Sequence, residues 1–218
     1  MTRFVLATVA ASTLASAASA SFTGYSVERG TTAGGNTRYS VYANFSASNL
    51  VFLNAFSFVN VSGTMNARHQ DFFVADGEVG TWQAGSSVSA ADRGEDSWVT
   101  ASGLATSSGW GSALDPGFAN GGTVGDINNG AGWYDATPGT ANAIGAGGQQ
   151  GGFRMLLMQV VRSGDDAGQA SSHSMQLSWK VAGTTTAIFG NGSFTIGVPA
   201  PGAMALLGLA GLAGRRRR

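Results

Sequence analysis

The sequence predicts an all-β fold, an antiparallel β-sandwich of the jelly-roll kind, with a β-barrel as the alternative. Apolar and polar residues alternate with a period of two in several segments, and glycine- and asparagine-rich turns separate these segments. Convincing helical periodicity is absent between residues 21 and 197. Because the strands alternate instead of being uniformly apolar, a parallel α/β sheet fits poorly. Helices are expected only at the two ends of the chain, as a signal helix and a membrane helix.

The first expected strands lie in the N-terminal half of the chain. Residues 25–29 form a plausible short strand, and residues 39–45 alternate between apolar and polar side chains. Residues 51–61 are apolar on both faces, which predicts a central strand covered on both sides. Residues 69–74 and 98–101 are further candidates.

The remaining expected strands lie near the end of the domain. Residues 153–161 again are apolar on both faces, and residues 174–181 place Met175, Leu177, Trp179 and Val181 on one face. Residues 184–189 and 193–198 flank Gly190-Asn191-Gly192. Because asparagine and glycine accept positive φ, this triplet predicts a hairpin turn.

Residues 103–152 form a long glycine-rich segment with several aromatic residues. A loop of this length is either functional or disordered, and its aromatic residues favour a partly ordered excursion that packs on the sandwich. Trp110 and Trp133 lie in it and are the candidates for a platform on which a sugar could stack, although packing in the core is the more ordinary role of tryptophan.

The N-terminus has the parts of a secretory signal peptide. Arg3 supplies the positive charge, residues 4–14 are apolar, and Ala18 and Ala20 form a small-x-small cleavage site before Ser21. We expect signal peptidase to remove residues 1–20, and the single exported domain to span residues 21–197.

The C-terminus ends in three consecutive parts. Val198, Pro199, Ala200, Pro201 and Gly202 break any preceding structure, because proline lacks an amide hydrogen and restricts the residue before it. An apolar helix is expected at 202–214, which is short for a bilayer core of about 30 Å unless the membrane thins locally. Arg215, Arg216, Arg217 and Arg218 then favour the cytoplasmic side.

This tail, residues 198–218, resembles a PEP-CTERM sorting domain, with alanine at position 200 where the namesake pattern has glutamate. The resemblance implies recognition by an exosortase-like membrane enzyme, transient anchoring in the inner membrane, and a final place at the cell surface or in the extracellular matrix. It also implies an exopolysaccharide as a neighbour. The exported domain resembles domains that precede such tails in planctomycete-type bacteria, through Tyr39-Ser40-Val41-Tyr42 and the stretch 192–197. That second resemblance brings no catalytic residue with it.

Charge and cysteine content exclude several classes of protein. The chain has no cysteine, hence no disulfide, thiolate metal site or thiol nucleophile. Its formal net charge is zero, but five of the twelve basic residues lie in the two end segments. The domain between them holds seven basic and twelve acidic residues, a net charge of −5. Nucleic acid is therefore not an expected partner.

Few residues suggest chemistry. His69 and His173 are the only histidines and neither adjoins a nucleophile motif, so no catalytic residue is assigned and an enzyme is not expected. No cofactor is expected either. The weak calcium candidates are Asp92, Glu95 and Asp96, with two alternatives at residues 126–129 and 165–166, although solvated turns explain all three equally simply.

These observations predict a non-enzymatic exported surface or matrix protein, processed through its tail. The alternative is a carbohydrate-binding module that uses Trp110 and Trp133.

Overall fold

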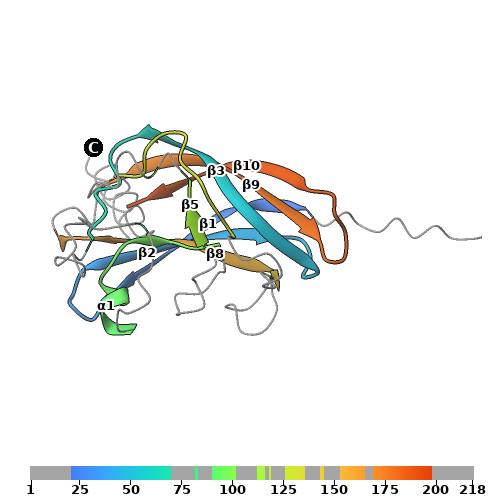
Figure 1. Cartoon of the computed structure of the whole chain (residues 1–218). Helices are drawn as coiled ribbons and strands as arrows, with labels where there is room; N and C mark the ends of the chain where they lie inside the picture. The colour runs from blue at the N-terminus through green and yellow to red at the C-terminus, as the bar shows by residue number, and fades with distance from the viewer. Residues whose placement is uncertain are drawn as a thin grey trace, which may run out of the picture.

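The computed structural model describes residues 21–69, 82, 90–101, 112–115, 118, 126–135, 143–144, 153–164 and 169–197. Regular structure in these residues consists almost entirely of strands in two antiparallel sheets, which confirms the all-β prediction (Figure 1). A helix of five residues, α1 (Ala90–Gly94), precedes the strand predicted at 98–101. The predicted signal segment 1–20, the sorting tail 198–218 and residues 70–74 lie outside the described residues.

Four strands form the first sheet, called sheet A, in the order β1-β2-β8-β4. They are β1 (Phe22–Thr31), β2 (Thr37–Phe45), β8 (Arg154–Arg162) and β4 (Trp98–Val99). The β1 and β2 strands form a hairpin whose pairing runs from Phe22 opposite Phe45 to Thr31 opposite Thr37. Sheet A therefore joins the beginning of the domain to segments more than fifty residues further along the chain.

Six strands form the second sheet, called sheet B. Its order is β10-β9-β3-β6-β5, and β7 also pairs with β3. The strands are β10 (Ile188–Ile196), β9 (Ser171–Val181), β3 (Leu50–Ser62), β6 (Trp133–Asp135), β5 (Ser112–Leu114) and β7 (Ala143–Ile144). Three of these short strands come from the 103–152 segment, so the described parts of that segment extend sheet B.

One hydrophobic core joins the two sheets. Alternate residues of β2 (Tyr39, Val41, Ala43 and Phe45) are buried in it, as are Leu177 and Trp179 of β9. The period-two alternation predicted for residues 39–45 and 174–181 is therefore confirmed. Aromatic rings make close contacts across this core: the ring centroids of Phe45 and Trp179 lie 5.4 Å apart and those of Tyr25 and Phe194 also 5.4 Å, both edge to face.

The prediction that residues 51–61 are covered on both faces is wrong. The β3 strand is central, but Val59 and Val61 are 38% and 60% exposed. The pairing with β9 has three irregularities, between Phe52 and Asn54, between Phe56 and Val59 and between Asn60 and Ser62, and they shift which residues face the core. Apolar residues at both odd and even positions of this segment therefore reflect irregular pairing and not burial of both faces of the strand. The corresponding prediction for 153–161 is confirmed, because β8 is buried along nearly its whole length.

The predicted hairpin at Gly190-Asn191-Gly192 is also wrong. These residues lie in the middle of β10, which pairs with β9 without interruption, and neither glycine has a positive φ. A β-carbon built on Gly190 would lie 3.0 Å from ring atoms of Phe22 and Trp179, and one on Gly192 would lie 3.0 Å from the Tyr25 ring. Glycine is needed here because aromatic side chains pack against the strand. The chain reverses instead at residues 182–187, where Gly183 has φ 82°.

Candidate functional site

Trp133, proposed as a sugar platform, is not available for stacking. Its side chain is only 1% exposed, and its Nε1 donates a hydrogen bond to the carbonyl of Thr100 at 3.0 Å. The ring also packs edge to face on Phe118, with centroids 6.1 Å apart. Because stacking needs an exposed ring face, the prediction for Trp133 is wrong. Trp110 lies outside the described residues.

Glu95, one of the weak calcium candidates, is already occupied by hydrogen-bond donors. Its carboxylate accepts from Thr32 Oγ1 at 2.7 Å, the Gly34 amide at 2.5 Å and Asn36 Nδ2 at 3.0 Å, all in the β1–β2 turn. These hydrogen bonds lower the pKa of Glu95, the one from Thr32 most of all. The carboxylate therefore ties α1 to the hairpin of sheet A.

Asp96 lies in a different environment from Glu95. It is buried, it accepts from the Ser97 amide at 2.8 Å, and its Oδ1 lies 3.5 Å from Nδ1 of His69. Among the residues that the structure describes, no three acidic or histidine side chains gather where a metal ion could bind. Glu95 and Asp96 thus do not form the calcium site considered from the sequence, and the side chain of Asp92 is not described.

The alternative calcium segment, 126–129, attaches to β3. Asn129 Oδ1 accepts from the Asn60 amide at 2.7 Å, and Asn60 Nδ2 donates to the carbonyl of Ile127 at 2.8 Å. Asp126 accepts a hydrogen bond from the Met65 amide. The oxygen atoms that suggested a cation site therefore receive hydrogen bonds from the protein itself. Residues 165–166 lie outside the described residues.

A buried polar network surrounds His173, on β9. Its Nε2 lies 2.9 Å from Ser171 Oγ and its Nδ1 lies 2.9 Å from Asn60 Oδ1. A serine, a histidine and an orienting amide in this order match the hydrogen-bond pattern of a serine-hydrolase triad. Ser171 and His173 are only 1% and 0% exposed, however, and burial together with the nearby Arg162 charge lowers the pKa of His173 to about 4. As described, no substrate can reach this serine.

Arg162, at the end of β8, explains why the network exists. Its buried guanidinium donates to the carbonyls of Met65 at 2.5 Å and Thr64 at 2.9 Å, to Ser171 Oγ at 2.6 Å, and to the carbonyl of Gln169. These acceptors come from two chain segments, residues 64–65 and 169–171, and Arg162 itself lies in a third. The network therefore fixes the end of sheet A to the end of sheet B. Sequence patterns could have hinted at it only through an arginine that closes an apolar strand.

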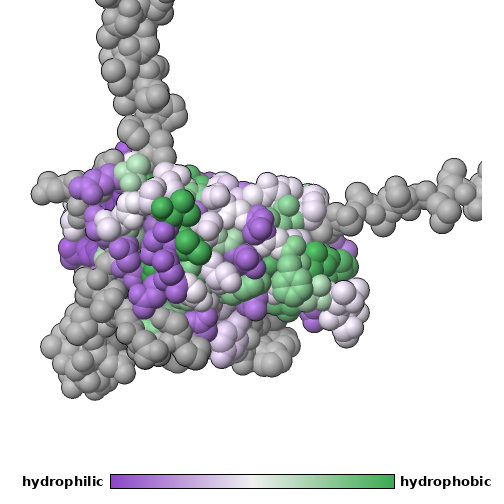
Figure 2. Space-filling model, turned by 90° about the horizontal axis from the view of Figure 1, so that it is seen from above, coloured by the Kyte–Doolittle hydropathy of each residue, from purple (hydrophilic) through white to green (hydrophobic). Residues whose placement is uncertain are grey.

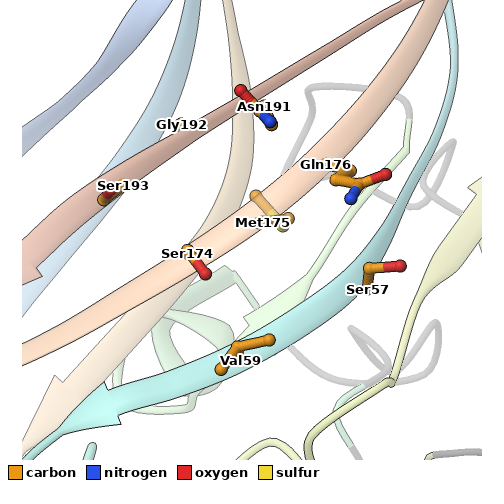
Figure 3. A pocket seen from close by; sticks show the side chains of 8 residues that line it. All are labelled: Ser57, Val59, Ser174, Met175, Gln176, Asn191, Gly192 and Ser193. Atoms are coloured by element: carbon orange, nitrogen blue, oxygen red, sulfur yellow. The ribbon is translucent and has the colours of Figure 1, made fainter.

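The outer face of sheet B is the most open candidate surface. Seen from above, it is a mosaic of hydrophilic and near-neutral residues with separate apolar patches (Figure 2). A shallow hollow of about 330 Å³ lies over β3, β9 and β10, beside the irregularity in β3 (Figure 3). Its polar lining consists of the side chains of Ser57, Ser174, Gln176, Asn191 and Ser193.

None of the described residues that line this hollow has a charged side chain. Hydroxyl and amide groups both donate and accept hydrogen bonds, so the hollow suits a neutral, hydroxyl-rich ligand. Phe56 and Phe189 form an edge-to-face pair on the same sheet, with centroids 6.3 Å apart, and Phe189 is 67% exposed. Sequence reasoning missed this surface because it interpreted residues 190–192 as a turn.

The two ends of the chain contribute little to the described structure. Ser21 is the first described residue, and its amide donates to Ser46 Oγ at 2.9 Å. Ala18 and Ala20, the proline motif Val198 to Gly202 and the four terminal arginines all lie outside the described residues. Within the part that is described, no helix is long and apolar enough to cross a membrane. No family model, curated protein or solved structure matches the chain.

Proposed function

We propose that the chain is a non-enzymatic exported protein that an exosortase-like enzyme processes at its C-terminal tail. The order of features in residues 198–218 carries this proposal: two prolines, an uncharged apolar run, and four arginines at the very end. The apolar run favours the bilayer, while the arginines oppose transfer across it. The final location is the cell surface or the extracellular matrix.

The described domain is consistent with this role as a compact exported unit. We infer that sheets A and B are the two layers of a β-sandwich, jelly-roll-like in outline, since both contribute side chains to the core around Phe45 and Trp179. A non-enzymatic role is supported by the burial of Ser171 and His173, the described side chains whose hydrogen bonding most resembles a catalytic set.

Intact-mass measurement of the full chain after expression in a Gram-negative host that has an exosortase-type enzyme tests this proposal. We expect loss of residues 1–20 and a second cleavage near residue 200. We also expect the double variant Pro199→Ala/Pro201→Ala to keep its tail. The matched control, Pro116→Ala, lies outside both end segments and should be processed normally. A full chain recovered with both ends intact in the cytosol contradicts the proposal.

A carbohydrate-binding module is the second candidate, and the hollow on sheet B supports it in place of the loop tryptophans. The lining of serine, glutamine and asparagine side chains matches the hydroxyl groups of a neutral polysaccharide. Under this proposal, Gln176→Ala and Asn191→Ala each weaken retention on a neutral polysaccharide matrix. Retention equal to that of the unchanged chain rules out the hollow as the binding surface.

A further inference from the structure

The outer face of sheet A contains a groove that none of the roles above uses. The groove has a volume of about 220 Å³ and crosses all four strands of the sheet. We call it the sheet A groove; the lining residues that matter below are Glu28 and Gly30 of β1, Arg38 and Ser40 of β2, Trp98 of β4 and Gln159 of β8. Strand pairing places Glu28 opposite Ser40, Ser40 opposite Gln159, and Gln159 opposite Trp98. These four side chains therefore form one row across the sheet.

Arg38 is the unusual member of this lining. The residue is half-buried, its Nε is fully buried, and it makes no hydrogen bond or ion pair with any described residue. The two arginines of β8 differ from it: Arg154 pairs with Glu28 at 2.6 Å, and Arg162 donates to four acceptors. A partly buried cation without a partner is unfavourable, so Arg38 suggests a missing anionic partner.

Glycine at position 30 leaves room beside this guanidinium. A β-carbon added there would lie 3.3 Å from Nη2 of Arg38, closer than most real contacts of this kind. The pairing of Gly30 with Arg38 puts both on the outer face of the sheet. A ligand can therefore approach the guanidinium from the β1 side.

Two other members of the lining, Glu28 and Gln159, offer hydrogen-bond acceptors. Gln159 Nε2 donates to the carbonyls of Arg93 at 2.9 Å and Asp96 at 2.8 Å, which leaves Oε1 as an acceptor. Glu28 uses Oε1 for Arg154 and retains a second carboxylate oxygen. Trp98 Nε1 donates to the Arg93 carbonyl at 3.1 Å, so the side chains at this end of the groove are held in place. The groove thus combines the Arg38 guanidinium, which has no partner among the described residues, with acceptors that are held in place.

We propose that the sheet A groove binds a uronate unit of an acidic polysaccharide. Such a sugar carries one carboxylate, which a guanidinium can bind through two parallel hydrogen bonds, and several hydroxyl donors for Glu28 and Gln159. A sulfate or phosphate group by itself brings no comparable set of hydroxyl donors for Glu28 and Gln159. The volume of the groove lies below the roughly 300–1,000 Å³ of pockets for drug-sized ligands, which limits the occupant to about one ring.

This binding does not depend on the export proposed above, because a groove binds its ligand wherever the chain is located. The test uses the full chain in mild detergent and short oligogalacturonides, with affinity measured by isothermal titration calorimetry at physiological ionic strength. We expect Arg38→Gln to weaken binding about tenfold or more, the effect of losing hydrogen bonds to a charged group. Because Arg38 makes no contact of this kind within the protein, the variant should stay folded, which far-UV circular dichroism checks.

Lys180→Gln is the matched control. It also removes one positive charge, but Lys180 belongs to β9 of sheet B and is not among the residues that line the sheet A groove. Its affinity should stay within about twofold of the unchanged chain. Arg38→Lys keeps the charge without the planar fork and should fall between the two.

Three results overturn the proposal. The first is the absence of oligogalacturonide binding by the unchanged chain. The second is an equal loss of affinity in Arg38→Gln and Lys180→Gln, which indicates diffuse attraction by net charge. The third is binding of inorganic sulfate or poly-glutamate as tight as that of the oligogalacturonide, which shows that the sugar hydroxyls contribute nothing.

Discussion

His173 and Arg162 occupy neighbouring buried positions with opposite requirements for charge. Arginine cannot lose its proton in a protein, so Arg162 is accommodated by four acceptors that surround its guanidinium. Histidine can become neutral, and burial with this cation nearby favours the neutral ring. In the neutral form one ring nitrogen donates and the other accepts, which suits its two partners, Asn60 and Ser171.

The lowered pKa of His173 makes stability depend on pH. Its pKa falls from 6.5 to about 4 on folding, so the unfolded chain binds the proton more readily between these values. The contribution of His173 is fully present above pH 6.5 and is lost as the pH falls toward 4. We expect a loss of up to about 3 kcal/mol from this group, measured by urea unfolding at a series of pH values.

His173→Gln supplies the control for this prediction. Glutamine can donate to one partner and accept from the other but does not titrate. The unfolding free energy of this variant should therefore change much less between pH 7 and 5 than that of the unchanged chain. The two proteins have the same carboxylates, so these groups contribute equally to the pH dependence of stability in both. Parallel pH profiles for the two proteins would contradict a role for His173.

Strands β3 and β10 show which elements could be predicted and which could not. In β2 and β9, every second residue faces the core without interruption. The alternation in the sequence therefore predicted correctly that Val41 and Leu177 are core residues. In β3, three irregularities in the pairing with β9 change which residues face the core, and their positions depend on β9, which the local sequence does not contain. In β10, the glycines meet rings from β1, a contact between residues more than 160 positions apart.

The candidate sites also depend on contacts between residues that lie far apart in the sequence. The burial of Trp133 depends on Thr100 and Phe118. The hydrogen bonds that the Glu95 carboxylate accepts come from a turn some sixty residues earlier. That Arg38 has no partner among the described residues follows from the placement of residues on several strands, which the local sequence does not contain. Residue types alone therefore suggested sites in loops, whereas the folded strands place the open polar surfaces on the sheets.

Gly190 gives the sharpest prediction at the scale of one strand. Gly190→Ala places a methyl group 3.0 Å from ring atoms of Phe22 and Trp179, which lie in the packed core and cannot move freely. We expect a loss of about 1–3 kcal/mol in unfolding free energy, the usual cost of overpacking. Gly94→Ala is the control: nothing lies within 4 Å of the added carbon, and the expected change is within about 0.5 kcal/mol. Equal effects of the two changes, measured by urea unfolding, would mean that β10 and β1 are not in close contact.

In the proposed sandwich, the two binding surfaces lie on opposite sides of the molecule. Both sheets contribute to the shared core, so in this arrangement the hollow over β3, β9 and β10 and the groove over β1, β2 and β8 face away from each other. Among the described residues, no charged side chain lines the hollow, whereas the groove carries the Arg38 cation, which has no partner among them. Under these proposals, a single domain could contact a neutral and an acidic polymer at the same time, a property suited to a matrix component.

The shared core also predicts that both sheets unfold together. Phe45 of sheet A packs on Trp179 of sheet B, so Phe45→Leu removes an aromatic contact between the sheets and should lower the unfolding free energy by about 1–2 kcal/mol. Tryptophan fluorescence reports on buried Trp98 in sheet A and on Trp179 in sheet B, while far-UV circular dichroism reports on all strands. In a cooperative domain both signals shift to the same lower urea midpoint. Phe189→Leu, at an exposed position of β10, should change the midpoint little. Separate midpoints for the two signals in Phe45→Leu would show that each sheet is stable without the other, and the domain would then not be a single folding unit.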